Sequence, residues 1–476
     1  MNRTAIVVGS GPNGLTAAAM LASRGVEVTI YEQANEPGGG ARSGEILGSG
    51  LVSDLGAAAH PFAIGSPAFR ALDLTAHGLE WVHPKYPMAH PLPGRDSAIL
   101  HRDAATTAAQ FGPDAAAWLR VHAPVTEHPL HTLENITGPL LRLPPHLLPM
   151  ASFGLRAAWP AATLARTMFK TPEARALFGG SAAHSMLPLH HPFSAAFGVI
   201  FGGLGHTSGW PVARGGTGQI IEALLSVLGS HGVRIHTGSP VTDLRELPAA
   251  DAVLLDLTPR QVLDLAGTQL SKRYRGWLRR WKYGTGAHKV DYLLDGPVPW
   301  RDERTADAGT VHMVGSFEEL VHAERLTNRG QVPDRPFVMA AQQSMADPTR
   351  VHGGQQILWS YAHVPNGSTA DVGPLIDAQF ERFAPGFRDR IIGRVETPPD
   401  ALQAWNPNLV GGDIGGGSLR GTQQFLRPAP TLRPYNTGQT GLYICSSSTP
   451  PGGGVHGMAG WHAAQAVVKD WAREQR

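Results

Sequence analysis

The sequence predicts an α/β fold built on a Rossmann-like, doubly wound parallel sheet. A short β-branched strand, TAIVVG, ends at the glycine turn GSGPNG and is followed by the alanine-rich helix LTAAAMLASRG. The next strand, VEVTIYE, ends on Glu32, about twenty residues beyond the turn. Strand, glycine turn, helix, strand and acid in this order are typical of a dinucleotide-binding unit.

Each residue of this first turn has a physical task. Gly9 permits the tight turn, Gly11 lets the backbone approach a pyrophosphate, and Gly14 lets the helix pack closely on the strand. Glu32 is placed to hold the ribose hydroxyls of the adenosine. Pro12 and Asn13 complete the turn and open the helix, so we expect the whole segment to bind a cofactor.

Length, charge and cysteine content limit the classes of protein to which this chain can belong. With 476 residues, 42% hydrophobic and 16% charged, the chain exceeds one core and predicts two domains or one with large insertions. A net charge of +2 gives no reason to expect nucleic acid. The single cysteine, Cys445, excludes an internal disulfide or a cysteine-based metal site, and we expect a small core residue in preference to a reactive thiol. No metal site is predicted.

The chain begins directly with the first strand, which favours a cytoplasmic protein without a signal peptide. Its most apolar stretch, residues 139–169, is interrupted by Arg142, Arg156, Arg166 and several prolines, so we do not expect it to cross a bilayer. The sequence sets no oligomeric state.

A second glycine turn follows Glu32 in QANEPGGGARSGEILGSGLVSDLGAAAH. GSGPNG, EPGGGARS and DLGAAAH together resemble the phytoene desaturase and amine oxidase group of FAD-dependent oxidoreductases, and most of all the bacterial phytoene-dehydrogenase-like proteins. The resemblance implies that Gly39, Gly40 and Arg42 meet the FAD pyrophosphate and that 54–57 leads towards the isoalloxazine ring. Taken by itself, this second glycine turn could instead be a mobile surface loop.

The segment WPVARGGTGQIIEALLSVLGSHGVRIHTGSPVTDL resembles the family's second nucleotide-binding piece, which places Val241 against the adenine. The buried strand 253–257 then returns to the sheet. Only RELP stands where the family commonly has a longer β-excursion.

The closing segment contains a second GxGxxG, formed by Gly452, Gly454 and Gly457, at a strand-to-helix crossing. Its amides and helix N-terminus indicate an anion or carbonyl site. The resemblance implies that Gly454, Val455 and His456 run beneath the flavin, at the other end of the same FAD. Ser447 and Ser448 depart from the glycine-rich pattern common in the family, and their hydroxyls could bind ribityl or phosphate oxygens.

The resemblance also implies an α+β substrate domain interleaved with the FAD-binding domain. A sheet in that domain would roof the flavin, and its helices would line a pocket for a lipophilic or flat substrate. The predicted FAD-binding segments are 1–70, 210–265 and 425–476, and the predicted substrate-domain segments are 71–209 and 266–424.

The resemblance implies transfer of hydride from a C–H bond to flavin N5, with oxygen or a quinone as acceptor. The chain carries no third dinucleotide fingerprint, so NAD(P)H is not expected. His60 and His456 are the candidate catalytic residues, because histidine can move a proton near neutral pH; packing at the pocket edge is the alternative for each. Lys289 is a weaker candidate, for which a solvated strand face is the alternative.

Two other functions fit the same cofactor: a flavin-bound isomerase without net redox change, and a non-catalytic carrier of lipophilic molecules. One further stretch, SKRYRGWLRRWKYG, places Tyr274, Trp277, Leu278 and Trp281 on one helical face among six cations. It predicts either a peripheral membrane contact or a helix packed into the domain.

Overall fold

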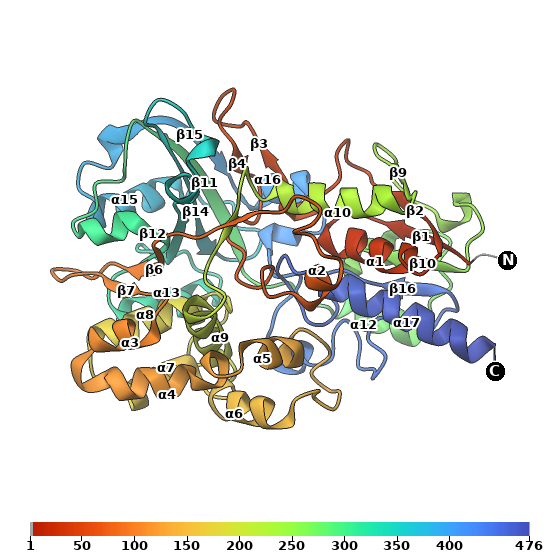
Figure 1. Cartoon of the computed structure of the whole chain (residues 1–476), viewed down its shortest axis with the longest axis horizontal. Helices are drawn as coiled ribbons and strands as arrows, with labels where there is room; N and C mark the ends of the chain where they lie inside the picture. The colour runs from red at the N-terminus through yellow and green to blue at the C-terminus, as the bar shows by residue number, and fades with distance from the viewer. Residues whose placement is uncertain (1–2, 476) are drawn as a thin grey trace.

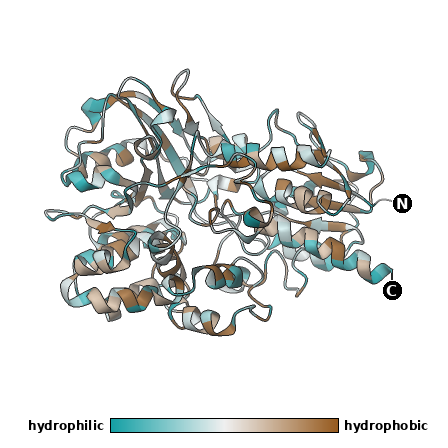
Figure 2. Cartoon of the chain, viewed as in Figure 1, coloured by the Kyte–Doolittle hydropathy of each residue, from teal (hydrophilic) through white to brown (hydrophobic). Residues whose placement is uncertain are grey.

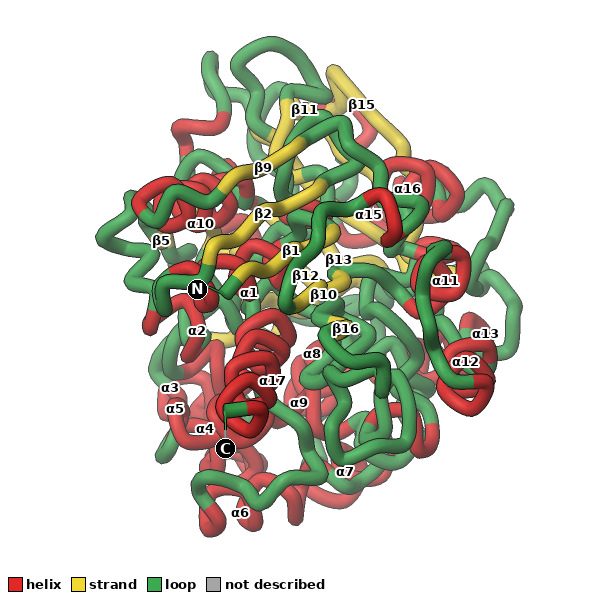
Figure 3. The backbone as a smooth tube through the Cα atoms, turned by 90° about the vertical axis from the view of Figure 1, so that its right-hand side faces the viewer, coloured by secondary structure: helices red, strands yellow, loops and turns green. Residues whose placement is uncertain are grey.

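The computed structural model describes residues 3–475 and contains two principal sheets. A five-stranded parallel sheet has the order β16-β10-β1-β2-β9, and Figure 3 views the molecule from this end. Its strands are β1 (Thr4–Val8), β2 (Glu27–Tyr31), β9 (Arg234–His236), β10 (Ala252–Leu255) and β16 (Leu442–Ile444). Three distant parts of the chain therefore build one sheet, which confirms the predicted fold class.

Helices cover both faces of this sheet because its strands are apolar on both sides. Ala5 and Val7 of β1 pack on the side of α1 (Pro12–Ala22), α10 (Gly218–Ser230) and α17 (Met458–Glu474). Ile6 and Val8 pack on the other side, towards α11 (Pro259–Asp264) and α12 (Lys272–Arg279). Figure 1 shows α1, α10 and α17 together near both chain ends.

The first and last helices pack closely because Gly460 of α17 lies against α1. A Cβ atom at Gly460 would stand 1.8 Å from the carbonyl oxygen of Asn13, so only glycine fits this crossing. The closing helix thereby holds the closing segment beside the first glycine turn.

The second sheet is mixed and has seven strands, in the order β15-β11-β14-β13-β12-β6-β7. β6 and β12 pair in parallel, and the other neighbours are antiparallel. The strands are β6 (Tyr86–His90), β7 (Ala98–Leu100), β11 (Gly286–Leu294), β12 (Ala308–Met313), β13 (Val338–Ala341), β14 (Gln356–Val364) and β15 (Ile391–Thr397).

One face of the seven-stranded sheet packs on α15 (Gly373–Phe383), and the other packs on a helical layer. The helical layer lies below the sheet in Figure 1. Its helices are α3 (Ala104–Ala109), α4 (Ala115–Thr126), α5 (Pro129–Ile136), α6 (Leu147–Ala157), α7 (Ala161–Met168), α8 (Pro172–Ala183), α9 (Ala195–His206) and α13 (Phe317–Thr327).

Short elements complete the fold. Two-stranded sheets join β3 (Ser43–Gly44) to β4 (Ser53–Asp54) and β5 (Trp81–Val82) to β8 (Val212–Ala213). The short helices are α2 (Pro67–Ala71), α14 (Gln343–Ala346) and α16 (Pro399–Trp405). Among residues 3–475, no helix has both the length and the apolar character needed to cross a membrane.

The aromatic face of α12 is turned inwards. Tyr274, Leu278 and Trp281 are buried, and Tyr274 and Leu278 belong to the core beneath the parallel sheet. Of the two alternatives for this stretch, membrane contact or packing into the protein, packing describes α12, because these side chains are not free to enter a bilayer.

Candidate active site

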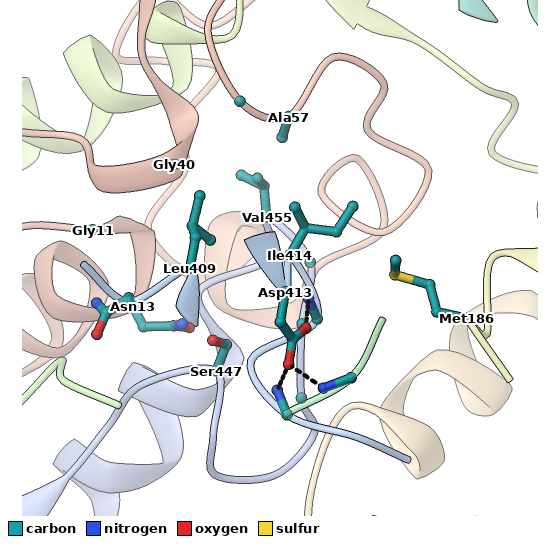
Figure 4. A pocket seen from close by; sticks show the side chains of 18 of the residues that line it. Gly11, Asn13, Gly40, Ala57, Met186, Leu409, Asp413, Ile414, Ser447 and Val455 are labelled. Atoms are coloured by element: carbon teal, nitrogen blue, oxygen red, sulfur yellow. Dashed lines mark hydrogen bonds between the residues drawn. The ribbon is translucent and has the colours of Figure 1, made fainter. Parts of the chain in front are cut away.

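A cavity of about 1130 Å³ is lined by residues of both sheets. It extends from Gly11 and Asn13 at one end, past Ser447 and Val455, to Met186 at the other (Figure 4). The first end is formed by strand termini and glycine turns, and the far end by helices of the layer that packs on the seven-stranded sheet. The cavity therefore joins a polar, glycine-rich end to an apolar end.

The two N-terminal glycine turns touch each other at the polar end. Gly39 has φ +54°, and a Cβ atom there would stand 2.9 Å from the Cα of Gly11. At Gly14 a Cβ atom would stand 2.2 Å from the carbonyl oxygen of Gly9. Side chains are excluded at these positions, which leaves backbone N–H groups and the N-terminus of α1 facing the cavity.

Glu32 is held rigidly where β2 ends. One carboxylate oxygen accepts hydrogen bonds from the backbone N–H and hydroxyl of Ser10, at 2.8 and 2.7 Å, and the other accepts from the N–H of Ala34 at 2.8 Å. The carboxylate lines the cavity, so its remaining lone pairs can accept hydroxyl groups.

Arg42 brings a cation to the same end. Its Nε donates to the carbonyl oxygen of Gly39 at 3.2 Å, and its guanidinium lies 4.8 Å from the centre of the Trp405 ring. Burial lowers the pKa of Arg42, while Glu32 and Glu36 act in the opposite direction. The cation is thus oriented beside the glycine turns.

Asp256, which follows β10, is a cavity residue that the sequence motifs did not single out. Its Oδ2 accepts from the N–H of Gly14 at 3.0 Å, and burial raises the pKa of this carboxyl to about 7. The side chain therefore occupies the N-terminus of α1, where a phosphate group would be favoured. Only its position, directly after a buried strand, could have drawn attention to it.

The closing segment returns to the cavity after β16. Ser447, Gly454, Val455 and His456 line the cavity, whereas Ser448 lies behind the wall and donates to the carbonyl oxygen of Gly416 at 3.0 Å. The role predicted for Ser448 is thus not supported by its position.

The two predicted catalytic histidines are buried and neutral. Burial lowers the pKa of His60 and of His456 to about 4. His60 Nε2 lies 2.8 Å from the hydroxyl of Thr217, which itself donates to the carbonyl oxygen of Ala57. His60 Nε2 therefore carries the proton, and its Nδ1 is a buried acceptor without a partner among residues 3–475.

His456 has a structural task. Its Nδ1 accepts from the N–H of Met458 at 3.1 Å, which satisfies one free donor at the start of α17. For both histidines the geometry favours the packing alternative, and a catalytic role stays a prediction.

Lys289 is not on a solvated strand face, so that expectation was wrong. Ala287, Lys289 and Asp291 share the cavity side of β11, and Lys289 is only 3% exposed. Its ammonium pairs with the carboxylate of Asp291 and lies 5.8 Å from the centre of the Trp359 ring. Burial lowers the pKa of Lys289. The second sheet thus presents one buried cation to the cavity.

A histidine pair at the far end was also missed. His184, just after α8, lines the cavity, and its Nε2 lies 2.8 Å from Nε2 of His312 on β12. Burial lowers the pKa of His184 to about 3, so the pair is neutral. These residues are 128 positions apart and lie in no motif, so no sequence pattern pointed to them.

Asp413 stabilises the loop between the two ends of the cavity through hydrogen bonds to backbone N–H groups. Its carboxylate accepts from the N–H groups of Gly284, Gly415 and Gly417 at 2.7, 2.7 and 2.9 Å (Figure 4). Every one of these contacts fixes backbone, so Asp413 acts as a positioning residue.

A buried ion network fixes the segment 54–57 that was expected to lead towards the flavin. Arg350 donates to Asp54 at 2.7 Å and to Asp347 at 3.1 Å, and all three side chains are inaccessible to solvent. Burial alone would raise the pKa of Asp54, but Arg350 and the N–H of Thr217 outweigh it and lower the pKa. Residues 54–57 are thereby tied to the segment that joins β13 and β14.

Most of the predicted cofactor residues line this one cavity. Gly14 and Ser448 are the two that do not. Those that do are Gly9, Gly11, Pro12, Asn13, Glu32, Gly39, Gly40, Arg42, Val241, Ser447, Gly454, Val455 and His456, and the predicted catalytic residue His60 joins them.

The cavity fits FAD in shape and in chemistry. Its volume exceeds the roughly 300–1,000 Å³ of a pocket for one drug-sized ligand, which leaves room for a long cofactor and a substrate. The polar end supplies a helix N-terminus, close-packed glycines, a carboxylate and an arginine, which are the groups that an adenosine diphosphate moiety requires.

Comparisons with known proteins agree with this geometry. Residues 7–73 match the NAD(P)-binding Rossmann-like domain model. The chain is 24% identical to the rat pyridine nucleotide-disulfide oxidoreductase domain-containing protein 2, covering 98% of this chain and 93% of the relative. It is 25% identical to the neurosporene-forming phytoene desaturase of Rhodobacter capsulatus, covering 96% and 92%.

Among solved structures, putrescine oxidase is similar over 99% of both chains, with a TM-score of 0.62 and 17% identity. This likeness concerns the fold. The chain is an FAD-dependent oxidoreductase that has the fold of putrescine oxidase and is similar along its length to the phytoene desaturases.

Proposed function

We propose that this protein removes hydride from a C–H bond of an uncharged, lipophilic small molecule, producing a C=C or C=N bond. FAD, when bound, supplies a two-electron acceptor at its N5 atom. Oxygen or a quinone is the proposed final acceptor, since the chain offers no third dinucleotide motif. The apolar far end of the cavity is the observation that carries this proposal.

The far end is built from large apolar side chains of the helical layer. Such a wall binds a hydrocarbon by removing its surface from water and offers few groups to solvate a charge. The lining residues there include Met150, Phe153, Phe193, Phe197, Ile200 and Phe201.

The charges around the cavity favour an uncharged substrate over a cationic amine. Among residues 3–475, four acids line the cavity: Glu32, Asp256, Asp264 and Asp413. Glu32 and Asp256 lie at the glycine turns, Asp264 ends α11 beside the parallel sheet, and Asp413 is occupied by three backbone N–H groups. A buried ammonium substrate would lack a free carboxylate partner.

The residues of the polar end would hold the cofactor. We propose that the two glycine turns and Arg42 bind the diphosphate, Glu32 the ribose, Val241 the adenine, and Ser447 with Gly454 and Val455 the flavin end. Forming a double bond also requires loss of a proton. Lys289 and His184 both face the cavity beyond the glycine turns, and we propose that they handle that proton in place of His60 and His456.

Anaerobic mixing of the purified flavoprotein with two substrate panels tests the proposal. Unsaturated hydrocarbons and apolar cyclic compounds should bleach the oxidised flavin band, whereas polyamines should leave it unchanged. Adding oxygen or a water-soluble quinone should then restore the band and identify the acceptor. Bleaching by polyamines alone would contradict the substrate class.

The same mixing experiment separates the two other functions. An isomerase would convert substrate with no bleaching and no acceptor consumed. A carrier would bind apolar compounds with neither conversion nor bleaching.

A further inference from the structure

Arg427 is a buried cation that has no carboxylate partner within residues 3–475. Its side chain is only 1% exposed, and burial lowers its pKa to about 10, so the guanidinium still carries its charge at neutral pH. By contrast Arg350, which is also fully buried, donates to two carboxylates, those of Asp54 and Asp347. A buried charge without such a partner is costly to the fold, so its presence requires a physical reason.

The guanidinium of Arg427 is held by backbone carbonyl groups. Its Nη2 donates to the carbonyl oxygens of Gly416 and Ser447, each at 3.1 Å. Its Nε lies 3.5 Å from the carbonyl oxygen of Ser448. Its Nη1 is enclosed by protein and has no partner among residues 3–475. The carbonyl dipoles offset part of the cost of burying the charge, but they do not neutralise it.

The surroundings of Arg427 are apolar. Its guanidinium carbon lies 5.3 Å from the centre of the Trp281 ring, and Ala429 belongs to the core beneath the parallel sheet. Figure 2 shows brown, hydrophobic segments among the strands and helices at this end of the molecule. From 414 to 469 the sequence contains no aspartate or glutamate. Asp413 acts on Arg427 through its charge, but its oxygens already accept from three backbone N–H groups.

Arg427 lies directly behind the part of the cavity wall that follows β16. Ser447, whose carbonyl group it holds, lines the cavity, and so does Gly452. A Cβ atom at Gly452 would stand 3.2 Å from Nη1 of Arg427. The same segment continues through Gly454 and Val455 to the N-terminus of α17. The guanidinium and a helix N-terminus thus place two sources of positive potential along one wall.

We propose that Arg427 supplies positive charge that stabilises the reduced, negatively charged form of FAD. This inference rests on the proposed place of the flavin end beside Ser447, Gly454 and Val455. Hydride brings two electrons and one proton, so the neutral oxidised ring gains one negative charge, which a cation in a dry site stabilises. Arg427 lies behind the wall and acts through its charge and the backbone that it holds, so it is a positioning residue.

The midpoint potential of the bound FAD tests this role without any substrate. Arg427→Met keeps a long side chain and removes the charge, so the potential should fall by at least about 30 mV, a tenfold less favourable two-electron reduction. Arg427→Lys keeps the charge and should stay close to the wild-type potential. A wild-type potential in Arg427→Met would overturn the proposal and leave Arg427 as a support for backbone carbonyl groups alone.

Arg433→Met is the matched control. Arg433 lies six positions further along the chain, pairs with Asp470, and has a side chain that is 52% exposed. Because solvent screens its charge, this replacement should leave the potential unchanged. The flavin spectrum and the melting temperature of each variant check that the cofactor and the fold are retained.

Wild type and Arg427→Lys decide the question if Arg427→Met does not retain FAD. The wild-type potential should lie above that of free FAD, because positive charge favours the reduced form, and Arg427→Lys should keep most of that difference. A wild-type potential at or below that of free FAD, or an Arg427→Lys potential that falls to it, would overturn the proposal. No substrate is added in these measurements, so their failure leaves the proposed substrate class standing, and failure of the substrate panels leaves the role of Arg427 standing.

Discussion

The carboxylate of Asp256 accepts a hydrogen bond from the backbone N–H of Gly14 at 3.0 Å. This contact places an acid at the N-terminus of α1, inside the turn that would bind a diphosphate. Glu32 lies on the same side and reinforces the rise in the pKa of Asp256 that burial causes. FAD would therefore meet two carboxyl groups, and its negative charge favours the protonated form of Asp256.

We expect FAD affinity to fall as pH rises through about 7, the raised pKa of Asp256. Below this pH the carboxyl is neutral and does not repel the diphosphate; above it, the carboxylate does. Asp256→Asn keeps an acceptor for Gly14 without the charge, so it should hold FAD equally well on both sides of pH 7. Fluorescence of FAD released after dilution measures the effect. A wild-type protein with pH-independent release would contradict the expectation.

The raised pKa of Asp256 also determines in which direction the stability of the apoprotein changes with pH. The folded apoprotein keeps a proton on Asp256 that the unfolded chain loses, between about pH 4 and the folded-state pKa of about 7. The free energy of unfolding contributed by this group therefore falls as pH rises through that window. In Asp256→Asn this component should be absent from thermal melts of the apoprotein.

Gly11→Val should abolish FAD retention. A Cβ atom at Gly11 would stand 2.7 Å from Oδ2 of Asp256, so a valine would collide with this carboxylate at the N-terminus of α1, where the diphosphate must approach. The purified variant should be colourless, with no FAD released on heating. Full flavin occupancy in Gly11→Val would refute the assignment of this turn.

Gly229→Ala provides the matched control for that substitution. Gly229 lies in α10, and a Cβ atom there meets nothing within 4 Å. The change should keep the flavin and alter stability by no more than about 1 kcal/mol, in the stabilising direction. It separates a loss of cofactor from a general effect of replacing glycine.

Cys445 should not react in the native protein. The thiol is fully buried at the end of β16, and burial raises its pKa well above the usual value, so no thiolate is available. A chromogenic disulfide reagent should detect no thiol in the native protein and one per chain in denaturant. Rapid native labelling would show that the strand opens to solvent.

The cofactor end could be predicted from sequence because its residues are adjacent along the chain. The turn at Gly9 to Gly14 and the acid at Glu32 are local consequences of strand, turn and helix, and the predicted strand-to-helix crossing at Gly452 to Gly457 lies between β16 and α17. The domain limits stay a prediction.

The residues that sequence reasoning missed are brought together by tertiary packing. Asp256 meets Gly14 across 242 positions, and Lys289 is buried only because β11 faces the cavity. An isolated strand pattern does not reveal which face is covered, so a lysine in it was expected to be solvated. The low pKa values of His60 and His456 were missed for the same reason. Burial causes them, and burial cannot be read from a motif.

Lys289→Met should lower turnover without removing FAD, because Lys289 faces the cavity beyond the glycine turns. The single change also leaves Asp291 buried without its partner, which should cost about 3–5 kcal/mol of stability. Its low activity alone would therefore not separate a catalytic role from partial unfolding.

The double variant Lys289→Met with Asp291→Asn makes that separation. It removes both charges of the pair, so the melting temperature should return towards that of wild type. If Lys289 handles a proton or orients the substrate, turnover should stay low in this stable protein, and the pH profile of kcat should change. If turnover recovers together with stability, Lys289 acts only through its ion pair, and His184 becomes the next cavity group to test for the proton.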